Sequence, residues 1–263
     1  MIDTCDNVFL GIPTYDGQLD AGVAQAAYLS CSRSRRVHVL TNGKSLLSSN
    51  CNTLYANALN LRKSHDIKWF AMLHADVVPG PYWLDQLIHE AERHQADMMS
   101  AVVAIKDERG ISSTAISSGD DWRQFGRLTF HQLHAPTFPI TFDIQTAADA
   151  LESLGGDLQV SECPRHGLLA NTGCMVVRLD RDWSEKLHFR NYDRIACENG
   201  SYFAMDFSED WYFSRLVASY GGKVCCTTRV PTLHGKFRFP NDRAWGRVHN
   251  DCDRRQSTHE LAS

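Results

Sequence analysis

Residues 69–79 of this 263-residue chain have the sequence WFAMLHADVVP. The first half is apolar and has the length of a buried strand, and Pro79 ends the strand because proline donates no ladder hydrogen bond. Alternation along an extended chain turns His74 and Asp76 to the same side. Since open α/β sheets bind ligands at the carboxyl ends of their strands, this pattern predicts a ligand site on His74 and Asp76. The alternative is a simple turn before Pro79, in which Asp76 is an ordinary turn residue.

Strands and helices alternate around this stretch. Apolar runs of strand length occupy residues 7–13, 37–40, 69–73 and 96–105. Apolar residues at helical spacing lie between them, at about residues 20–29, 48–64 and 83–91. A chain that alternates in this way forms a parallel sheet covered by helices. We therefore expect an α/β fold with a Rossmann-like, mostly parallel central sheet flanked by helices.

The pattern changes between residue 106 and about residue 161. Serine, threonine, proline and aromatic residues cluster there without a clean period. We expect an irregular half with short strands, which forms either an acceptor pocket or lid or an ordinary β-rich insertion. Regular structure resumes at residues 169–178 with a polar turn followed by a buried strand, and the chain becomes polar after Arg243. The sequence therefore predicts one domain over residues 1–245 and a polar C-terminal tail over 246–263.

Composition narrows the class of protein. The chain is 43% hydrophobic and 22% charged, as in ordinary globular proteins. Its net charge of −4 argues against broad binding to nucleic acid or to a membrane surface, and no stretch approaches the ~20 apolar residues of a membrane span. The nine cysteines are scattered and odd in number, and the first residues carry acids instead of a basic leader. We therefore expect no signal peptide and a cytoplasmic location with reduced thiols.

Two further stretches offer groups that can bind a nucleotide. The first strand ends in Pro13, Thr14, Tyr15 and Asp16, which either contact a nucleoside or form a tight turn. The helix at 48–64 is unusually rich in asparagine. Within it, Asn52 and Asn57 are either ligands for a base, ribose or diphosphate, or surface residues. The chain lacks the glycine-rich fingerprints of dinucleotide and P-loop sites, so those classes lose support.

The last part of the chain supplies acids and a histidine. Glu209 and Asp210 follow the cap residue Ser208, so they either stabilise the first turn of a helix or include a general base. Asn171 stands in a polar turn before a buried strand, where a substrate can bind. His234 follows the last strand and either lies on the surface or completes a metal site with Asp76.

The order of these pieces resembles the GT-A class of glycosyltransferases, and most of all the broad family 2 group. The resemblance extends over about residues 7–240. The matching pieces are, in chain order, Gly11-Ile12-Pro13-Thr14-Tyr15, His74-Ala75-Asp76, Asn171-Thr172-Gly173, Ser208-Glu209-Asp210 and His234. The short Asp-x-Asp motif of the class, which binds a divalent metal, is represented by His74 and Asp76, with histidine in place of the first aspartate.

The resemblance implies a role for each matching position. A divalent cation, Mn²⁺ or Mg²⁺, is expected on Asp76 and His234, with His74 as a further candidate. Asp210 takes the position of the base in inverting members, and Glu209 lies beside it. The expected nucleotide-sugar-binding residues are Pro13, Thr14, Tyr15, Asp16, Asn52, Asn57 and Ala75. The expected acceptor-binding residues are Asn171, Thr172 and Trp211.

These expectations combine into a metal-dependent glycosyltransferase with a GT-A-like fold. It would move a sugar from a nucleoside-diphosphate sugar to an acceptor hydroxyl, with inversion. A nucleotidyltransferase on a related sheet is the first alternative, but it needs basic residues near the first loop. A non-catalytic sugar-nucleotide or carbohydrate-binding protein is the second, and His74 in place of aspartate favours it. The sequence specifies neither the sugar, nor the acceptor, nor the oligomeric state.

Overall fold

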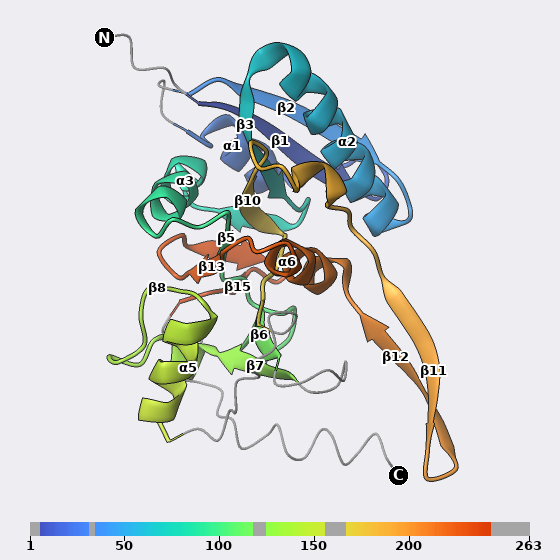
Figure 1. Cartoon of the computed structure of the whole chain (residues 1–263), viewed down its shortest axis with the longest axis vertical. Coiled ribbons are helices and arrows are strands. Elements are labelled where there is room, and N and C mark those ends of the chain that lie inside the picture. The colour runs from blue at the N-terminus through green and yellow to red at the C-terminus, as the bar shows by residue number, and fades with distance from the viewer. Residues whose placement is uncertain (1–5, 32–34, 118–124, 156–166, 243–263) are drawn as a thin grey trace.

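The computed structural model describes residues 6–31, 35–117, 125–155 and 167–242. Within these residues, seven strands form a central sheet in the order β2-β1-β3-β10-β5-β13-β8 (Figure 1). They are β1 (Asn7–Thr14), β2 (Val37–Gly43), β3 (Ile67–Leu73), β5 (Met98–Ala101), β8 (Thr141–Phe142), β10 (Cys174–Arg178) and β13 (Val224–Thr227).

Most of this sheet is parallel. β1 pairs in parallel with β2 and β3, and β13 pairs in parallel with β5. β10 lies between β3 and β5 and is antiparallel to both, and β8 is antiparallel to β13. The predicted α/β class, with a large, mostly parallel sheet flanked by helices, is therefore confirmed. The reversed direction of β10 was not predicted, because an apolar strand has the same pattern in either direction.

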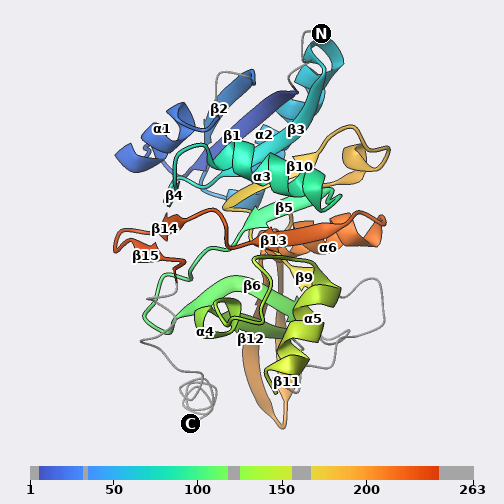
Figure 2. The ribbon, with the colours of Figure 1, turned by 90° about the vertical axis from the view of Figure 1, so that its left-hand side faces the viewer.

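Helices cover both faces of the sheet (Figure 2). α1 (Ala21–Tyr28) and α3 (Trp83–Arg93) pack with Val8 and Leu10 of β1. α2 (Leu47–His65) and α6 (Glu209–Ser219) pack with Phe9, whose side chain points to the opposite face. Successive residues of a strand alternate between faces, so burial of both faces requires a continuous apolar run.

Of the half predicted to be irregular, residues 106–161, the structure describes 106–117 and 125–155, and this part is more regular than predicted; residues 118–124 and 156–161 lie outside the described residues. β6 (Ile111–Ser117), β7 (Phe125–Thr129) and β9 (Leu168–Leu169) form a small antiparallel sheet, and α4 (Phe130–Leu133) follows β7. α5 (Ile144–Ser153) was missed in the sequence. It begins with a capping box between Asp143 and Thr146, and it buries Ala147, Ala150 and Leu151 on one face, a signal that the sequence analysis did not use. β8 was also missed, because tertiary pairing with β13 decides it.

Two further small sheets complete the described fold. β14 (Thr232–His234) pairs with β4 (Val77–Pro79) and with β15 (Phe239–Pro240). β11 (Tyr192–Glu198) and β12 (Ser201–Phe207) form a hairpin that extends away from the body (Figure 1). A single turn of 3₁₀ helix, η1 (Ser184–Lys186), precedes this hairpin. The two-residue turn of the β11–β12 hairpin has Asn199 at φ 51° and Gly200 at φ 79°, the left-handed conformation that tight hairpins favour.

The predicted tail, residues 246–263, lies outside the described residues, and the single-domain boundary stays a prediction. In the part of the chain that the structure describes, no helix combines the length and the hydropathy needed to cross a membrane.

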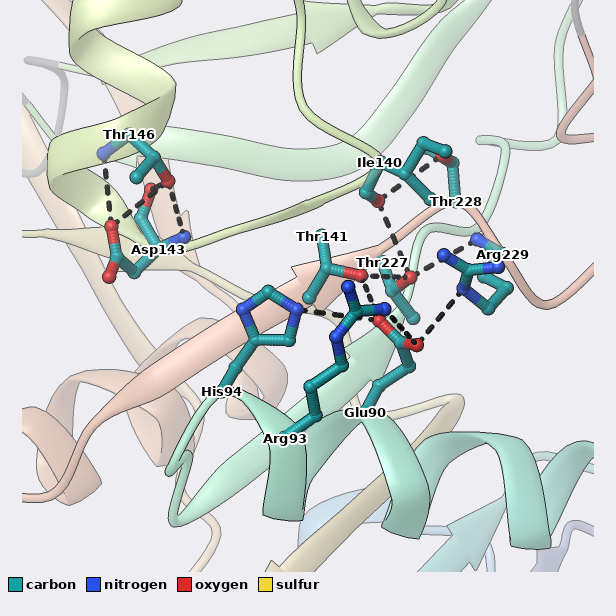
Figure 3. A network of polar contacts seen from close by, with 10 residues as sticks. All are labelled: Glu90, Arg93, His94, Ile140, Thr141, Asp143, Thr146, Thr227, Thr228 and Arg229. Carbon is teal, nitrogen blue, oxygen red and sulfur yellow. Dashed lines mark hydrogen bonds and ion pairs between the residues drawn. The ribbon is translucent and has the colours of Figure 1, made fainter.

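A buried acid ties α3 to the central sheet (Figure 3). The Glu90 side chain is 2% exposed, and its Oε1 lies 3.0 Å from Nε of Arg229. Its Oε2 accepts a hydrogen bond of 2.5 Å from the Thr141 hydroxyl, which is also 2.8 Å from the hydroxyl of Thr227. The network therefore connects α3 with β8 and β13.

Glu90→Gln is expected to lower the free energy of unfolding by about 2–3 kcal/mol, because the buried side chain loses its charge-assisted contact with Arg229 and one of its two acceptor oxygens. Urea denaturation followed by circular dichroism measures this loss. Glu92→Gln, on the exposed side of the same helix, is the control and should change stability by less than about 0.5 kcal/mol. Equal denaturation midpoints for the two variants would contradict the role of Glu90.

Candidate functional site

The candidate site lies where β3 ends and β10 begins. The two strands are antiparallel with Leu73 opposite Cys174, so the segments that follow and precede them meet at one edge of the sheet. The backbone N–H of His74 donates a hydrogen bond of 2.8 Å to the carbonyl of Gly173. The stretches around residues 74–76 and 171–173 are thereby brought together at one edge of the sheet.

Gly173 is required by close packing. A Cβ atom at this position would lie 2.7 Å from Asn171 Oδ1 and 3.4 Å from His74 Nδ1. The backbone N–H of Gly173 instead donates a hydrogen bond of 2.7 Å to Asn171 Oδ1. This contact fixes the Asn171 amide so that its NH₂ group is directed away from Gly173.

Asn171 and Thr172 both bind the carboxylate of Asp210. Asn171 Nδ2 donates to Oδ2 at 2.8 Å, and the Thr172 hydroxyl donates to Oδ1. Burial raises the pKa of Asp210, and the hydrogen bond from Thr172 offsets part of that rise. The carboxylate is thus held in one orientation at the start of α6, where Ser208 caps the helix by accepting from the N–H of Trp211.

Glu209 lies beside Asp210 and is 7% exposed. Burial, with a further contribution from the charge of Asp210, raises the pKa of Glu209 to about 6. A buried carboxyl with a raised pKa is typical of functional sites, because ordinary structural acids are exposed or paired.

The raised pKa of Glu209 makes the stability of the protein depend on pH. The unfolded chain ionises near 4.5 and the folded chain near 6, so stability falls as pH rises through this window. Above the window, ionised Glu209 costs about 2 kcal/mol of stability. Glu209→Gln should therefore gain about 2 kcal/mol relative to the wild type between pH 4 and pH 8, measured by urea denaturation at both values. If the stability of the wild type and of Glu209→Gln changed with pH in parallel, this expectation would be contradicted. Glu92→Gln again serves as the control.

Asp76 lies between two nitrogen groups. Its Oδ1 is 3.7 Å from Nε2 of His234, and its Oδ2 forms an ion pair with Lys106. Burial alone would raise the pKa of Asp76, but His234 and Lys106 more than offset this and hold the pKa well below its ordinary value. Asp76 is therefore a carboxylate at neutral pH.

The Asp76 and His234 pair fits a divalent cation. His234 Nδ1 lies 2.5 Å from the carbonyl of Ala104, so this nitrogen carries a proton. In the neutral ring Nε2 would then present its lone pair to a cation that Asp76 also binds. Metal-binding histidines commonly donate their second N–H to a carbonyl in this way.

His74, the third candidate ligand, is buried close to this pair. Its Nε2 is buried and has no hydrogen-bond partner within the described residues, and burial lowers its pKa. Among the residues that the structure describes, no three histidine, cysteine, aspartate or glutamate side chains lie close enough together to hold a metal. A cation at Asp76 and His234 would thus take its remaining ligands from substrate and water.

The nucleotide-side candidates at and after the end of β1 differ in their exposure. Pro13 and Thr14 are buried, and the Thr14 hydroxyl bonds the carbonyl of Asn42 and the N–H of Gly17. Tyr15 is 75% exposed, so its ring is free to stack on a planar group. Asp16 accepts a hydrogen bond from the N–H of Gln18. Ala75 is half-buried next to Asp76.

Asn52 and Asn57 lie on α2 in a shallow hollow of about 560 Å³ that none of the catalytic or metal candidates lines. Both ends of the Asn52 amide are engaged by the backbone of Phe189, at 2.8 Å and 2.7 Å. Asn57 donates to the carbonyl of Thr53, one turn earlier. The Asn52 amide therefore fixes the chain before β11.

Trp211 is packed inside the protein, with 6% of its surface exposed. Its indole N–H donates a hydrogen bond of 2.9 Å to the carbonyl of Ser113, and the guanidinium of Arg127 lies 4.5 Å from the ring. The structure places it between α6 and β6, whereas the other two acceptor-side candidates, Asn171 and Thr172, hold Asp210.

Sequence reasoning missed Lys106. It stands directly after the predicted strand at 96–105, and its ammonium contacts Asp76. The signal was present, because a polar residue after a strand of a parallel sheet points to the ligand edge.

The sequence matches no protein-family model, and no curated protein matches it significantly. Three solved structures are weakly similar. A197 from STIV has a TM-score of 0.47 and 15% identity over 88% of this chain and 85% of that chain. TarS 1-349 of S. aureus has a TM-score of 0.37 and 9% identity over 85% of this chain and 58% of that chain. A putative UDP-N-acetylglucosamine pyrophosphorylase from Entamoeba histolytica has a TM-score of 0.33 and 11% identity over 82% of this chain and 57% of that chain. The chain thus spans less than two thirds of the last two, and these similarities carry no functional inference.

Proposed function

We propose that this protein is a glycosyltransferase that moves a sugar from a nucleoside-diphosphate sugar to an acceptor hydroxyl. One observation carries the proposal: a carboxylate able to bind a cation, Asp76, and an oriented carboxylate able to accept a proton, Asp210, belong to the same edge of the sheet. Hydrogen bonds support this closeness: the N–H of His74 donates to the carbonyl of Gly173, and the neighbouring Asn171 and Thr172 donate to Asp210.

Asp210 is the general base of the proposed reaction. The acceptor oxygen forms a bond to the anomeric carbon while the bond from that carbon to the diphosphate oxygen breaks, and the acceptor proton passes to Asp210. Asn171 and Thr172 hold the carboxylate in position during this transfer. Its raised pKa favours acceptance of the proton. Attack opposite the leaving group inverts the configuration.

Asp76 and His234 would hold a divalent cation, Mn²⁺ or Mg²⁺, and His74 lies near them. Such a cation, when bound, offsets the charge that develops on the leaving diphosphate. Tyr15 is the candidate for stacking on the nucleobase, since its ring is exposed beside the end of β1. The proposal includes a cytoplasmic location and leaves the acceptor unspecified.

A thermal-shift panel tests the donor class. UDP, GDP, CDP, ADP and dTDP are each added with and without Mn²⁺ or Mg²⁺. A ligand at 100 times its Kd should stabilise the protein by about 2.7 kcal/mol, which is easily measured. A shift with one nucleotide that requires metal would support the proposal. Absence of any shift would contradict it and favour a protein that acts on another ligand class.

A further inference from the structure

Lys106 blocks one side of the carboxylate that the proposed function assigns to a divalent cation. Its Nζ pairs with Asp76 Oδ2, while Oδ1 faces His234 at 3.7 Å. We propose that Lys106 is a built-in counter-ion that competes with the divalent cation for Asp76, so that the cation binds only when the ammonium leaves. This inference rests on the proposed function, because it assumes that Asp76 is the cation ligand.

The loop after β14 shapes the position of the lysine. Gly235 follows His234 and has φ +70°. A Cβ atom on Gly235 would lie 3.2 Å from Cγ and 3.3 Å from Cδ of Lys106, so the lysine stem packs directly on this glycine. The N–H of Gly235 donates a hydrogen bond of 2.8 Å to the carbonyl of Asp76. The absence of a side chain at this position thus lets the stem lie across the loop, with its ammonium at Asp76.

One short segment holds the first partner of Asp76, His234, and supplies the second, Lys106. The carbonyl of Ala104 accepts the His234 Nδ1 proton at 2.5 Å, and two residues later Lys106 pairs with the carboxylate. Ala104 is fully buried, whereas the Lys106 side chain is 54% exposed. The histidine is therefore fixed, but the ammonium can leave Asp76 for solvent or for a phosphate without disturbing the core.

The two cations compete because they would share one carboxylate, with the ammonium at Oδ2 and the divalent cation at Oδ1 beside His234. Like charges a few ångströms apart repel even in water, and the repulsion doubles for a divalent ion. The ion pair is partly exposed, so it is weak enough to be displaced. The free protein should accordingly bind divalent cations more weakly than its Asp76 and His234 pair alone would allow.

Titration of the full-length protein with Mn²⁺ alone, by isothermal calorimetry and by the electron paramagnetic resonance of free Mn²⁺, tests this competition. Lys106→Met should bind Mn²⁺ about tenfold more tightly than the wild type, because the competing charge is gone. Lys106→Arg keeps the charge and should bind as the wild type does. Lys236→Met, an exposed lysine two residues after His234, controls for the change in net charge and should have a smaller effect.

Each contrary outcome is decisive. Equal Mn²⁺ affinity for the wild type and Lys106→Met would overturn the role of Lys106 and leave the proposed cation site intact. An equal gain in Mn²⁺ affinity in Lys106→Met and Lys236→Met would show that only the net charge matters, and would also overturn the role of Lys106. Failure of all four proteins to bind Mn²⁺ would overturn both this inference and the cation site of the proposed function.

Discussion

Asp210→Asn is expected to lower kcat by about 10²–10⁴-fold, the usual contribution of a positioned general base. The amide cannot take the acceptor proton. It also replaces one acceptor oxygen by an NH₂ group, although both Asp210 oxygens now accept from Asn171 and Thr172. Donor binding should be unchanged, because the proposed cation ligands are untouched.

Two readouts separate this effect from misfolding. Release of nucleoside diphosphate from the donor measures turnover, and the thermal shift with nucleotide and metal measures binding in the same variant. Asp206→Asn, an exposed aspartate on β12, is the matched control and should retain wild-type kcat. If Asp210→Asn keeps most of its turnover, Asp210 is not the base and inversion by that residue is excluded.

Asp76→Asn should produce the second large effect. Loss of the carboxylate removes the group that faces both His234 and Lys106, so kcat/KM is expected to fall about 10³-fold, equivalent to ~4 kcal/mol of transition-state stabilisation. The metal-dependent part of the thermal shift should disappear as well. The fold should persist, since the Asp76 side chain is 40% exposed.

Asp107→Asn is the control for this substitution. Asp107 follows Lys106 in the chain and forms its own ion pair with Arg109 at 2.6 Å, so it matches Asp76 in charge and neighbourhood. It should keep its activity and its metal response. A metal-dependent thermal shift that survives in Asp76→Asn would remove Asp76 from the cation site.

Local sequence determined the buried strands β1 and β3, the helices α3 and α6, and the position of the site edge. β1 and β3 are buried on both faces, so their residues must be continuously apolar, and α3 and α6 have one apolar face each. The polar residues that end β3 and begin α6 therefore identified His74, Asp76, Glu209 and Asp210 as candidates before any contact was known.

Tertiary structure decided which of these candidates meet, and with what partners. Asp76 is paired with Lys106, and Asp210 is held by Asn171 and Thr172. Tertiary structure also pairs both ends of the Asn52 amide with the backbone of Phe189. Periodicity encodes the face on which a side chain lies, but not which distant segment packs against that face. Hydrogen bonds and ion pairs depend on distances through space, so the direction of β10, the helix α5 and the contact between Lys106 and Asp76 appear only when the chain is folded.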